Sequence, residues 1–264
     1  MRRLLVLLPL ILGASGVIAQ GEDRESRALS VSRAAIGSSL PDIALRNTAG
    51  RAVRLSGFRG KPVLLTMVYT GCADICPTLI ETLYPAVVEA QSALGKDSFS
   101  VLTVGFDVRS DTSERMRLMA RGRGIDLPNW HFLAADQANL NVLAKAVGFA
   151  FYARPGGFDH LAQVSLIDKD GKLHGQVYGA IFEPPLIVEP LKDLVFGRYR
   201  PISSLQGLLD RIKLFCTVYD PNSGRYYFDY SLFGGIAIGT LCLGLILAFI
   251  INEWRRPPGT SGRV

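Results

Sequence analysis

The apolar positions between residues 37 and 200 follow two periods that predict a mixed fold. Residues 62–70 and 99–106 are almost continuously apolar, which predicts strands buried on both faces. Residues 78–94 place apolar side chains at helical spacing instead, and Gly95 follows where such a helix would end. The same reasoning predicts helices over 115–121, 137–147 and 185–196, a short strand over 130–133, and hairpins over 41–55 and 164–178.

The order of these segments predicts the fold class. Strands and helices alternate through the middle of the chain, and pairs of strands stand before and after them. We therefore predict that residues 37–200 form an α/β sandwich, with a leading β-hairpin, strands buried between helix layers and a closing antiparallel hairpin. Such a fold places its chemistry in a loop at the carboxyl end of a buried strand.

The two ends of the chain predict membrane targeting. Residues 1–19 combine a basic start, an apolar run and small residues, the pattern of a signal peptide, with an uncleaved anchor as the alternative. Residues 232–251 form an uncharged apolar run long enough for a transmembrane helix. Arg255 and Arg256 follow this run, which predicts a cytoplasmic tail over 252–264. We expect one C-terminal span in the inner (cytoplasmic) membrane, with the domain on the periplasmic side.

The connecting segments and the net charge say less about fold and function. Residues 20–36 are rich in arginine, serine and alanine, which predicts a linker, and residues 201–231 predict a membrane-proximal extension with an amphipathic helix over 203–215. Part of the formal charge of +6 lies in arginines beside the two apolar ends. Because no basic block alternates with aromatic residues, we predict that nucleic acid is not a partner.

The strongest chemical signal is the pair Cys72 and Cys76, at the junction of a predicted strand and helix. Residues four apart share a helix face, so both sulfurs can bind one partner or join in a disulfide bond. An exported domain meets oxidising conditions, which leaves three readings. The pair can be a structural disulfide, a redox-active pair that attacks another protein's disulfide, or a thiolate site for copper(I).

A copper(I) site with two thiolates usually has a further ligand, and the chain contains three histidines. His131 lies in a short apolar segment and is expected to be packed, whereas His174 lies in the closing hairpin and is expected to be solvated. His160 follows a glycine pair, which predicts a flexible loop, and the adjacent Asp159 could orient its ring. Spacing alone does not show whether His160 reaches the cysteines.

These residues resemble the Sco/SenC family of copper chaperones. The resemblance runs from about Gly37 to Phe196, and it is carried by the motif at residues 69–77, by Asn129–Leu133 and by Asp159–His160. It implies a thioredoxin-like fold and a role in assembling the CuA centre of cytochrome c oxidase.

By this resemblance the copper ligands are Cys72, Cys76 and His160, and Asp107 and Asp111 belong to an acidic loop typical of the family. The implied partners are the oxidase subunit that carries CuA, other copper chaperones and thiol reductants. The chain departs from the family pattern at Ala73, at Leu161–Ala162 and in its C-terminal anchor.

Two other functions stay open at this point. The chain could be a thiol-disulfide oxidoreductase, with Cys72 and Cys76 as the catalytic pair, that reduces the oxidase subunit's cysteines or senses redox state. It could also be an interaction module that displays its sheet, or the segment around Cys216, to an oxidase partner. For that segment a membrane-proximal cap is the simpler reading.

Overall fold

The structure is a computed structural model, and it describes residues 24–197, 216–220, 223 and 225–255. The chain divides into two compact units, residues 1–201 and 202–264, which are taken separately below. The predicted signal peptide, residues 1–19, and the predicted helix 203–215 lie outside the described residues.

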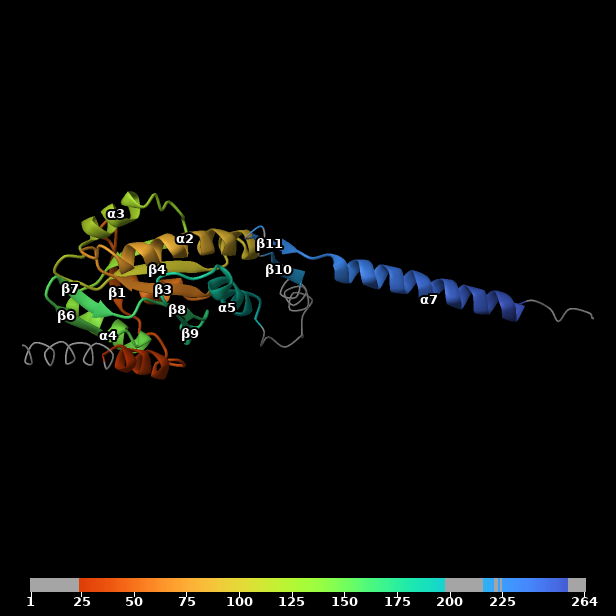
Figure 1. The fold of residues 1–264 in the computed structure, drawn as a ribbon, viewed down its shortest axis with the longest axis horizontal. Helices are drawn as coiled ribbons and strands as arrows, with labels where there is room; N and C mark the ends of the chain where they lie inside the picture. Colours follow the sequence, from red (N-terminus) through yellow and green to blue (C-terminus); the bar gives the residue numbers. More distant parts are fainter. Residues whose placement is uncertain (1–23, 198–215, 221–222, 224, 256–264) are drawn as a thin grey trace, which may run out of the picture. The chain divides into compact units, whose positions relative to one another are not determined.

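The first unit is built on one seven-stranded mixed sheet, in the order β2-β1-β5-β4-β3-β8-β9 (Figure 1). Three central strands, β3, β4 and β5, run parallel, and β1 and β8 flank them in the antiparallel sense. The strands are β1 Ala44–Asn47, β2 Ala52–Arg54, β3 Val63–Val68, β4 Ser100–Gly105, β5 Trp130–Ala134, β8 Gln163–Ile167 and β9 Leu173–Tyr178. Every residue of β3 and β4 is buried, which confirms the strands predicted from continuous apolar runs.

Four helices of this unit have the predicted positions. They are α2 Ile75–Leu94, α3 Ser113–Gly122, α4 Gln137–Val147 and α5 Pro185–Phe196. Thr112 caps α3 by accepting the Arg115 N–H, and Asp136 caps α4 by accepting the Asn139 N–H. In Figure 1, α2 and α3 lie on the same face of the sheet, as right-handed crossovers from β3 to β4 and from β4 to β5 require, and α4 lies on the other face.

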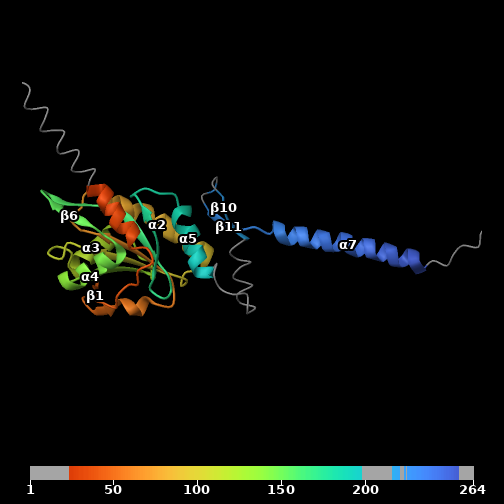
Figure 2. The same cartoon turned by 90° about the horizontal axis from the view of Figure 1, so that it is seen from below.

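Residues 24–34 are helical, and the linker predicted for residues 20–36 is wrong for this part (Figure 2). Ala28 and Ser32, four residues apart, are buried on one face of the helix. The Ser32 hydroxyl donates to the Gln163 side chain at 3.0 Å and accepts from the Tyr178 hydroxyl at 3.0 Å. These contacts fasten the segment to the domain.

A small hairpin precedes the closing pair of strands, with β6 at Phe151–Arg154 and β7 at Gly157–His160. Four antiparallel pairs join its strands, from Phe151 opposite His160 to Arg154 opposite Gly157. The flexible loop predicted to carry His160 is therefore an ordered strand. The Pro155–Gly156 turn supplies the positive φ that the hairpin needs, +83° at Gly156.

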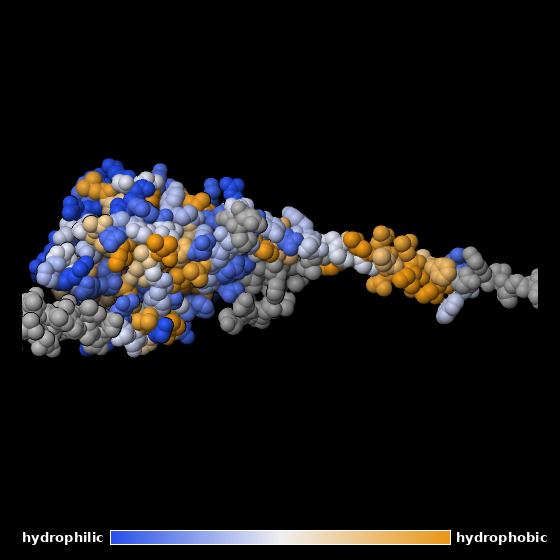
Figure 3. All heavy atoms as spheres, in the orientation of Figure 1, coloured by the Kyte–Doolittle hydropathy of each residue, from blue (hydrophilic) through white to orange (hydrophobic). Residues whose placement is uncertain are grey.

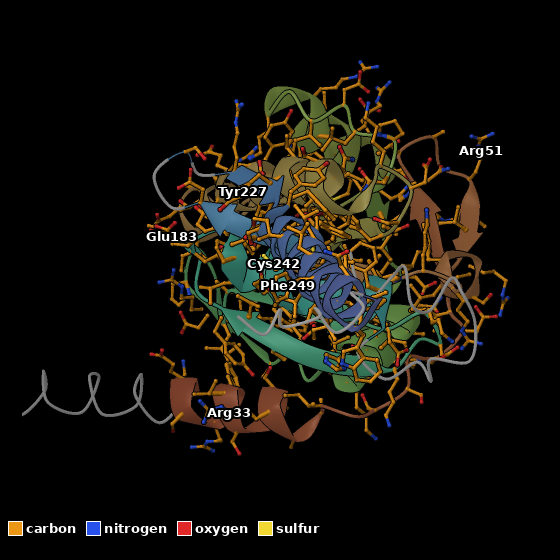
Figure 4. The ribbon with its side chains drawn as sticks, turned by 90° about the vertical axis from the view of Figure 1, so that its right-hand side faces the viewer. Arg33, Arg51, Glu183, Tyr227, Cys242 and Phe249 are labelled. Carbon is orange, nitrogen blue, oxygen red and sulfur yellow. The ribbon has the colours of Figure 1, made fainter. Side chains whose placement is uncertain are left out.

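The described residues of the second unit form a hairpin and a long helix. The hairpin pairs β10, Thr217–Asp220, with β11, Arg225–Phe228, and the helix α7 runs over Ser231–Arg255. Within α7, Phe233–Asn252 is long and apolar enough to cross a membrane by length and composition alone. Figure 3 shows this helix covered with hydrophobic side chains, and Cys242 and Phe249 in Figure 4 belong to it.

Candidate functional site

The cysteine loop lies where the sequence places it, between the carboxyl end of β3 and the first turn of α2. Cys72 is half-buried in the loop, and Cys76, in the first turn of the helix, is fully buried. The Cys76 N–H donates to Cys72 Sγ at 3.3 Å, so a free donor of the helix N-terminus points at this sulfur. Both cysteines are free thiols in the structure.

The two thiols have opposite acid–base properties. Burial works to raise the pKa of Cys72, but backbone N–H groups of Cys76 and Asp74 and nearby side chains stabilise the thiolate, and the pKa is lowered. Burial raises the pKa of Cys76 far above that of an ordinary thiol, and the neighbouring Cys72 adds to this effect. Cys72 is therefore the thiol that ionises first.

His160 faces the buried cysteine, and its ring orientation follows from its hydrogen bonds. Its Nδ1 lies 2.9 Å from the Leu161 carbonyl oxygen, which can only accept, so Nδ1 carries the proton. Its Nε2 lies 3.8 Å from Cys76 Sγ. Burial is the main cause that lowers the pKa of His160, which favours a neutral ring with a lone pair on Nε2, directed at the sulfur.

Aromatic rings enclose His160 and hold it in place. Its ring centroid lies 5.1 Å from that of Phe106, 5.5 Å from Phe149 and 6.0 Å from Tyr69. The Tyr69 hydroxyl also reaches the backbone of the β6–β7 hairpin, because a Cβ added at Gly157 would lie only 2.5 Å from it. Tyr69, in the same loop as Cys72, thus packs against the strand that carries His160.

The predicted role of Asp159 is wrong. Its carboxylate lies 3.0 Å from Arg154 Nε and 3.5 Å from Arg24 Nη1, while the His160 Nδ1–H donates to the Leu161 carbonyl oxygen. Successive residues of a strand point to opposite faces, so Asp159 faces away from the ring that it was expected to orient. It ties the hairpin to residues 24–34 instead.

Asp111 holds the cysteine loop from the side of β4. Its buried carboxylate accepts the Thr70 N–H at 2.8 Å, the Thr70 hydroxyl at 2.7 Å and the Asp107 N–H at 2.8 Å. Burial raises its pKa, and the hydrogen bonds from Thr70 and Asp107 oppose that effect. Of the two residues expected in an acidic loop, Asp111 therefore anchors the cysteine loop, and Asp107 donates its backbone N–H to the Asp111 carboxylate.

The other two histidines lie on other strands of the first unit, and the other two cysteines belong to the second unit. His131 is half-buried in β5 with its ring 5.1 Å from Phe58, and burial lowers its pKa, which confirms a packed residue. His174 is exposed on β9, as predicted. Cys216 is buried beside the β10–β11 hairpin and Cys242 lies on α7, both in the second unit.

Tyr69 and Thr70 lie in the motif at residues 69–77, but no role was predicted for either, and no role in the site was predicted for Gly157. The positions of Tyr69 and Thr70 just before Cys72 were the signal, but not their partners, which lie on the β6–β7 hairpin and beyond β4. For Gly157 the sequence offers one signal, the adjacent Gly156, and a pair of glycines predicts a flexible loop. Its contact with Tyr69 joins positions 88 residues apart and has no trace in spacing.

The residues fit a soft metal ion, although the ligand set is not preassembled. Within the described residues, no three His, Cys, Asp or Glu side chains form a ready-made metal site. Two of the predicted ligands nevertheless face each other. A metal about 2.3 Å from a thiolate and about 2.0 Å from an imidazole nitrogen, distances typical of zinc, separates the two by about 3.7 Å at a trigonal angle. The observed separation of Cys76 Sγ and His160 Nε2 is 3.8 Å.

The difference between the thiols predicts selective alkylation. We expect brief treatment of the reduced chain with iodoacetamide to modify Cys72 well before Cys76, because Cys72 is half-exposed and has the lowered pKa. The Cys72 rate should rise with pH and reach half its maximum at a lower pH than the rate of an ordinary thiol does, because the pKa of Cys72 is lowered. Fragmentation mass spectrometry of the peptide that contains both residues checks this. Equal labelling of Cys76 would contradict the burial described here.

Comparison with known proteins gives a consistent family and fold. A family model described as SCO1/SenC matches residues 38–195. A Bacillus subtilis relative named SCO1 protein homolog is 25% identical over 134 residues, 48% of this chain and 67% of the relative.

Solved structures agree with that match. A crystal structure from Aquifex aeolicus VF5 is 27% identical with a TM-score of 0.57, covering 62% of this chain and 97% of that one. The copper-bound structure of Bradyrhizobium japonicum ScoI is 25% identical with a TM-score of 0.50, covering 60% and 99%. The first unit thus has the mixed α/β, thioredoxin-like fold of the Sco proteins, as the resemblance implied.

Proposed function

This chain belongs to the SCO1/SenC family, and we propose that it is a membrane-anchored copper chaperone that holds one copper ion through Cys72, Cys76 and His160. The observation that carries the proposal is the pair Cys76 Sγ and His160 Nε2, 3.8 Å apart with the nitrogen lone pair free. The copper-bound structure of the related ScoI supports copper as the metal.

The donor set favours copper(I) on chemical grounds. Thiolates are soft ligands that select copper(I), and a neutral imidazole completes a site of low coordination number. Such an ion can pass to an acceptor by exchange of one ligand at a time. Cys72, half-exposed and readily ionised, is the ligand that an incoming thiolate can replace first, while Cys76 and His160 keep the ion from solvent.

The domain would lie outside the cytoplasm. The apolar stretch of α7 would serve as the anchor, and Arg255 and Arg256 after it would keep the tail inside. The acceptor would then be an oxidase subunit that displays its CuA ligands on the periplasmic side of the inner membrane.

The test is copper stoichiometry of the full chain in detergent, measured anaerobically in two redox states. We expect the reduced chain to bind one copper(I), with a thiolate charge-transfer band, and the chain with a preformed Cys72–Cys76 disulfide to bind none. A zinc-loaded sample of the reduced chain serves as the spectroscopic control. If the reduced chain binds no copper, or the oxidised chain binds it equally well, the proposal is wrong.

A second function is favoured by the hydrogen bond from Cys76 N–H to Cys72 Sγ and by the lowered pKa of Cys72, the features of an attacking thiol. The Cys72 thiolate would attack a partner's disulfide, giving a mixed disulfide and a free partner thiolate. Cys76 would then displace the second partner sulfur, so the partner gains two electrons and the chain becomes oxidised. The Cys76→Ser variant should accumulate the mixed disulfide, and its absence would count against this function.

A further inference from the structure

A basic surface lies beside the cysteine loop, on α3 and the loop that leads into it. Between residues 109 and 126 the chain has five arginines and three acidic residues, Asp111, Glu114 and Asp126. Asp111 is buried, and Glu114 is paired with Arg117. Arg109, Arg115 and Arg121 are exposed, and among the described residues none of the three has an ion pair. In Figure 3 hydrophilic side chains gather over α3.

The position of these arginines follows from the fold. Asp111 bonds to Thr70, so the loop that carries Arg109 lies against the cysteine loop. Arg115 is in the first turn of α3, which begins two residues after Asp111. Arg115, Leu118 and Arg121 follow at steps of three residues, along one exposed side of the helix, and Leu118 keeps half of its surface exposed.

From this geometry we propose that Arg109, Arg115, Leu118 and Arg121 form a docking surface for an acidic protein, the one that exchanges copper or electrons with Cys72 and Cys76. The inference rests on the proposed function and adds the chemistry of the partner. Guanidinium groups pair with carboxylates in a bidentate way, and arginines around an exposed apolar side chain have the composition of a protein interface.

An acidic protein fits this surface better than an anionic bilayer does. Ligand exchange needs the acceptor's sulfurs within bonding reach of Cys72, so the partner has to occupy the rim of the site. The hydrogen bonds from Thr70 to Asp111 hold the loop of Arg109 against the cysteine loop, and Arg115 follows in the first turn of α3. If these arginines lay on lipid headgroups, the same contact would cover the approach to Cys72. A protein partner uses the charge to orient itself and to raise the association rate.

The experiment compares two dithiol peptides that differ only in charge. Each holds a Cys-x-x-x-Cys segment, flanked in one by aspartate and glutamate and in the other by asparagine and glutamine. The copper-loaded full chain, in neutral phosphatidylcholine nanodiscs, transfers copper to each peptide, and the rate is measured in about 0.01 M and about 1 M salt. We expect the acidic peptide to react about tenfold faster in low salt, with the difference lost in high salt.

Matched variants assign the effect to this surface. R115E/R121E and R33E/R51E each change the net charge by the same amount, and Arg33 and Arg51 are exposed on other elements (Figure 4). The turn before Arg51 lies toward the amino end of β5, away from the cysteine loop. The α3 variant should lose the preference for the acidic peptide, and the R33E/R51E control and R115K/R121K should keep most of it. All three should keep the copper stoichiometry of the unmodified chain.

Two further measurements distinguish a failure of the proposed function from a failure of the docking surface. The same peptides in disulfide form test docking through thiol-disulfide exchange, so a chain that binds no copper refutes the proposed function while the docking surface is still tested. Added phosphatidylglycerol vesicles test whether the surface binds anionic lipid instead of a protein. Equal rates for both peptides, or an equal loss in R33E/R51E, would overturn the inference. Vesicle binding that depends on Arg115 and Arg121, without peptide discrimination, would overturn it in favour of a membrane surface.

Discussion

Replacing His160 by alanine is expected to lower the copper(I) affinity of the reduced chain about 100-fold. Loss of a residue that only supports a metal ligand commonly costs about 10- to 100-fold in affinity, and His160 Nε2 faces Cys76 Sγ directly, so its loss should reach at least the upper end of that range. The measurement is competition for copper(I) with a chromophoric chelator, under anaerobic conditions.

Two variants make this result specific. His131→Ala is the matched control, because His131 is also half-buried against an aromatic ring but lies in β5, outside the site. It should leave copper affinity unchanged. His160→Leu keeps an apolar side chain among Phe106, Phe149 and Tyr69 and guards against a loss caused by the cavity. If His160→Leu bound copper as tightly as the unmodified chain, His160 would not be a ligand.

Much of the fold was predictable because its signals are local. The helices at 137–147 and 185–196 have the predicted bounds, since Asp136 caps the first and Gly148 and Gly197 end the two in left-handed conformations. The buried strands were evident as continuous apolar runs, and their alternation with helices left few possible topologies.

The failures share a physical cause, which is that a distant partner decides the structure. Residues 24–34 look like a polar linker, and only contacts with Gln163 and Tyr178, more than 130 residues away, show which face is buried. The two short strands of the β6–β7 hairpin show no clear alternation of apolar and polar residues, so the glycines between them predict a flexible loop. Its order comes from the aromatic rings around it.

The candidate site was half predictable for the same reason. Cys72 and Cys76 are four residues apart at the start of α2, so the sequence alone predicts that they are close. Cys76 and His160 are 84 residues apart, and no spacing predicts their contact. They meet because β8 pairs with β3 in the antiparallel sense. That pairing brings the start of β8, and the hairpin just before it, to the carboxyl end of β3. The strand order thus assembles the site from the cysteine loop and the β6–β7 hairpin. Residues that connect these two segments are the points of the site most sensitive to substitution.

Gly157 is such a point, and Gly157→Ala is expected to damage both stability and copper binding. Its φ of +152° disfavours a side chain, and the added Cβ would lie 2.5 Å from the Tyr69 hydroxyl and 3.3 Å from Cζ of the same ring. The tyrosine is buried and the hairpin is paired, so neither can move freely. We expect unfolding in urea to show a loss of about 2–3 kcal/mol, and copper(I) affinity to fall about tenfold as His160 shifts.

Gly156→Ala separates the clash from the backbone strain. Gly156 also has a positive φ, +83°, but a Cβ added there meets nothing within 4 Å. This control should lose about 1 kcal/mol from strain and keep its copper affinity. The double variant Tyr69→Phe/Gly157→Ala removes the hydroxyl that the new methyl group meets, so it should recover part of both losses. If Gly157→Ala matched Gly156→Ala in stability and in affinity, the contact between Tyr69 and the β6–β7 hairpin would not hold His160 against Cys76.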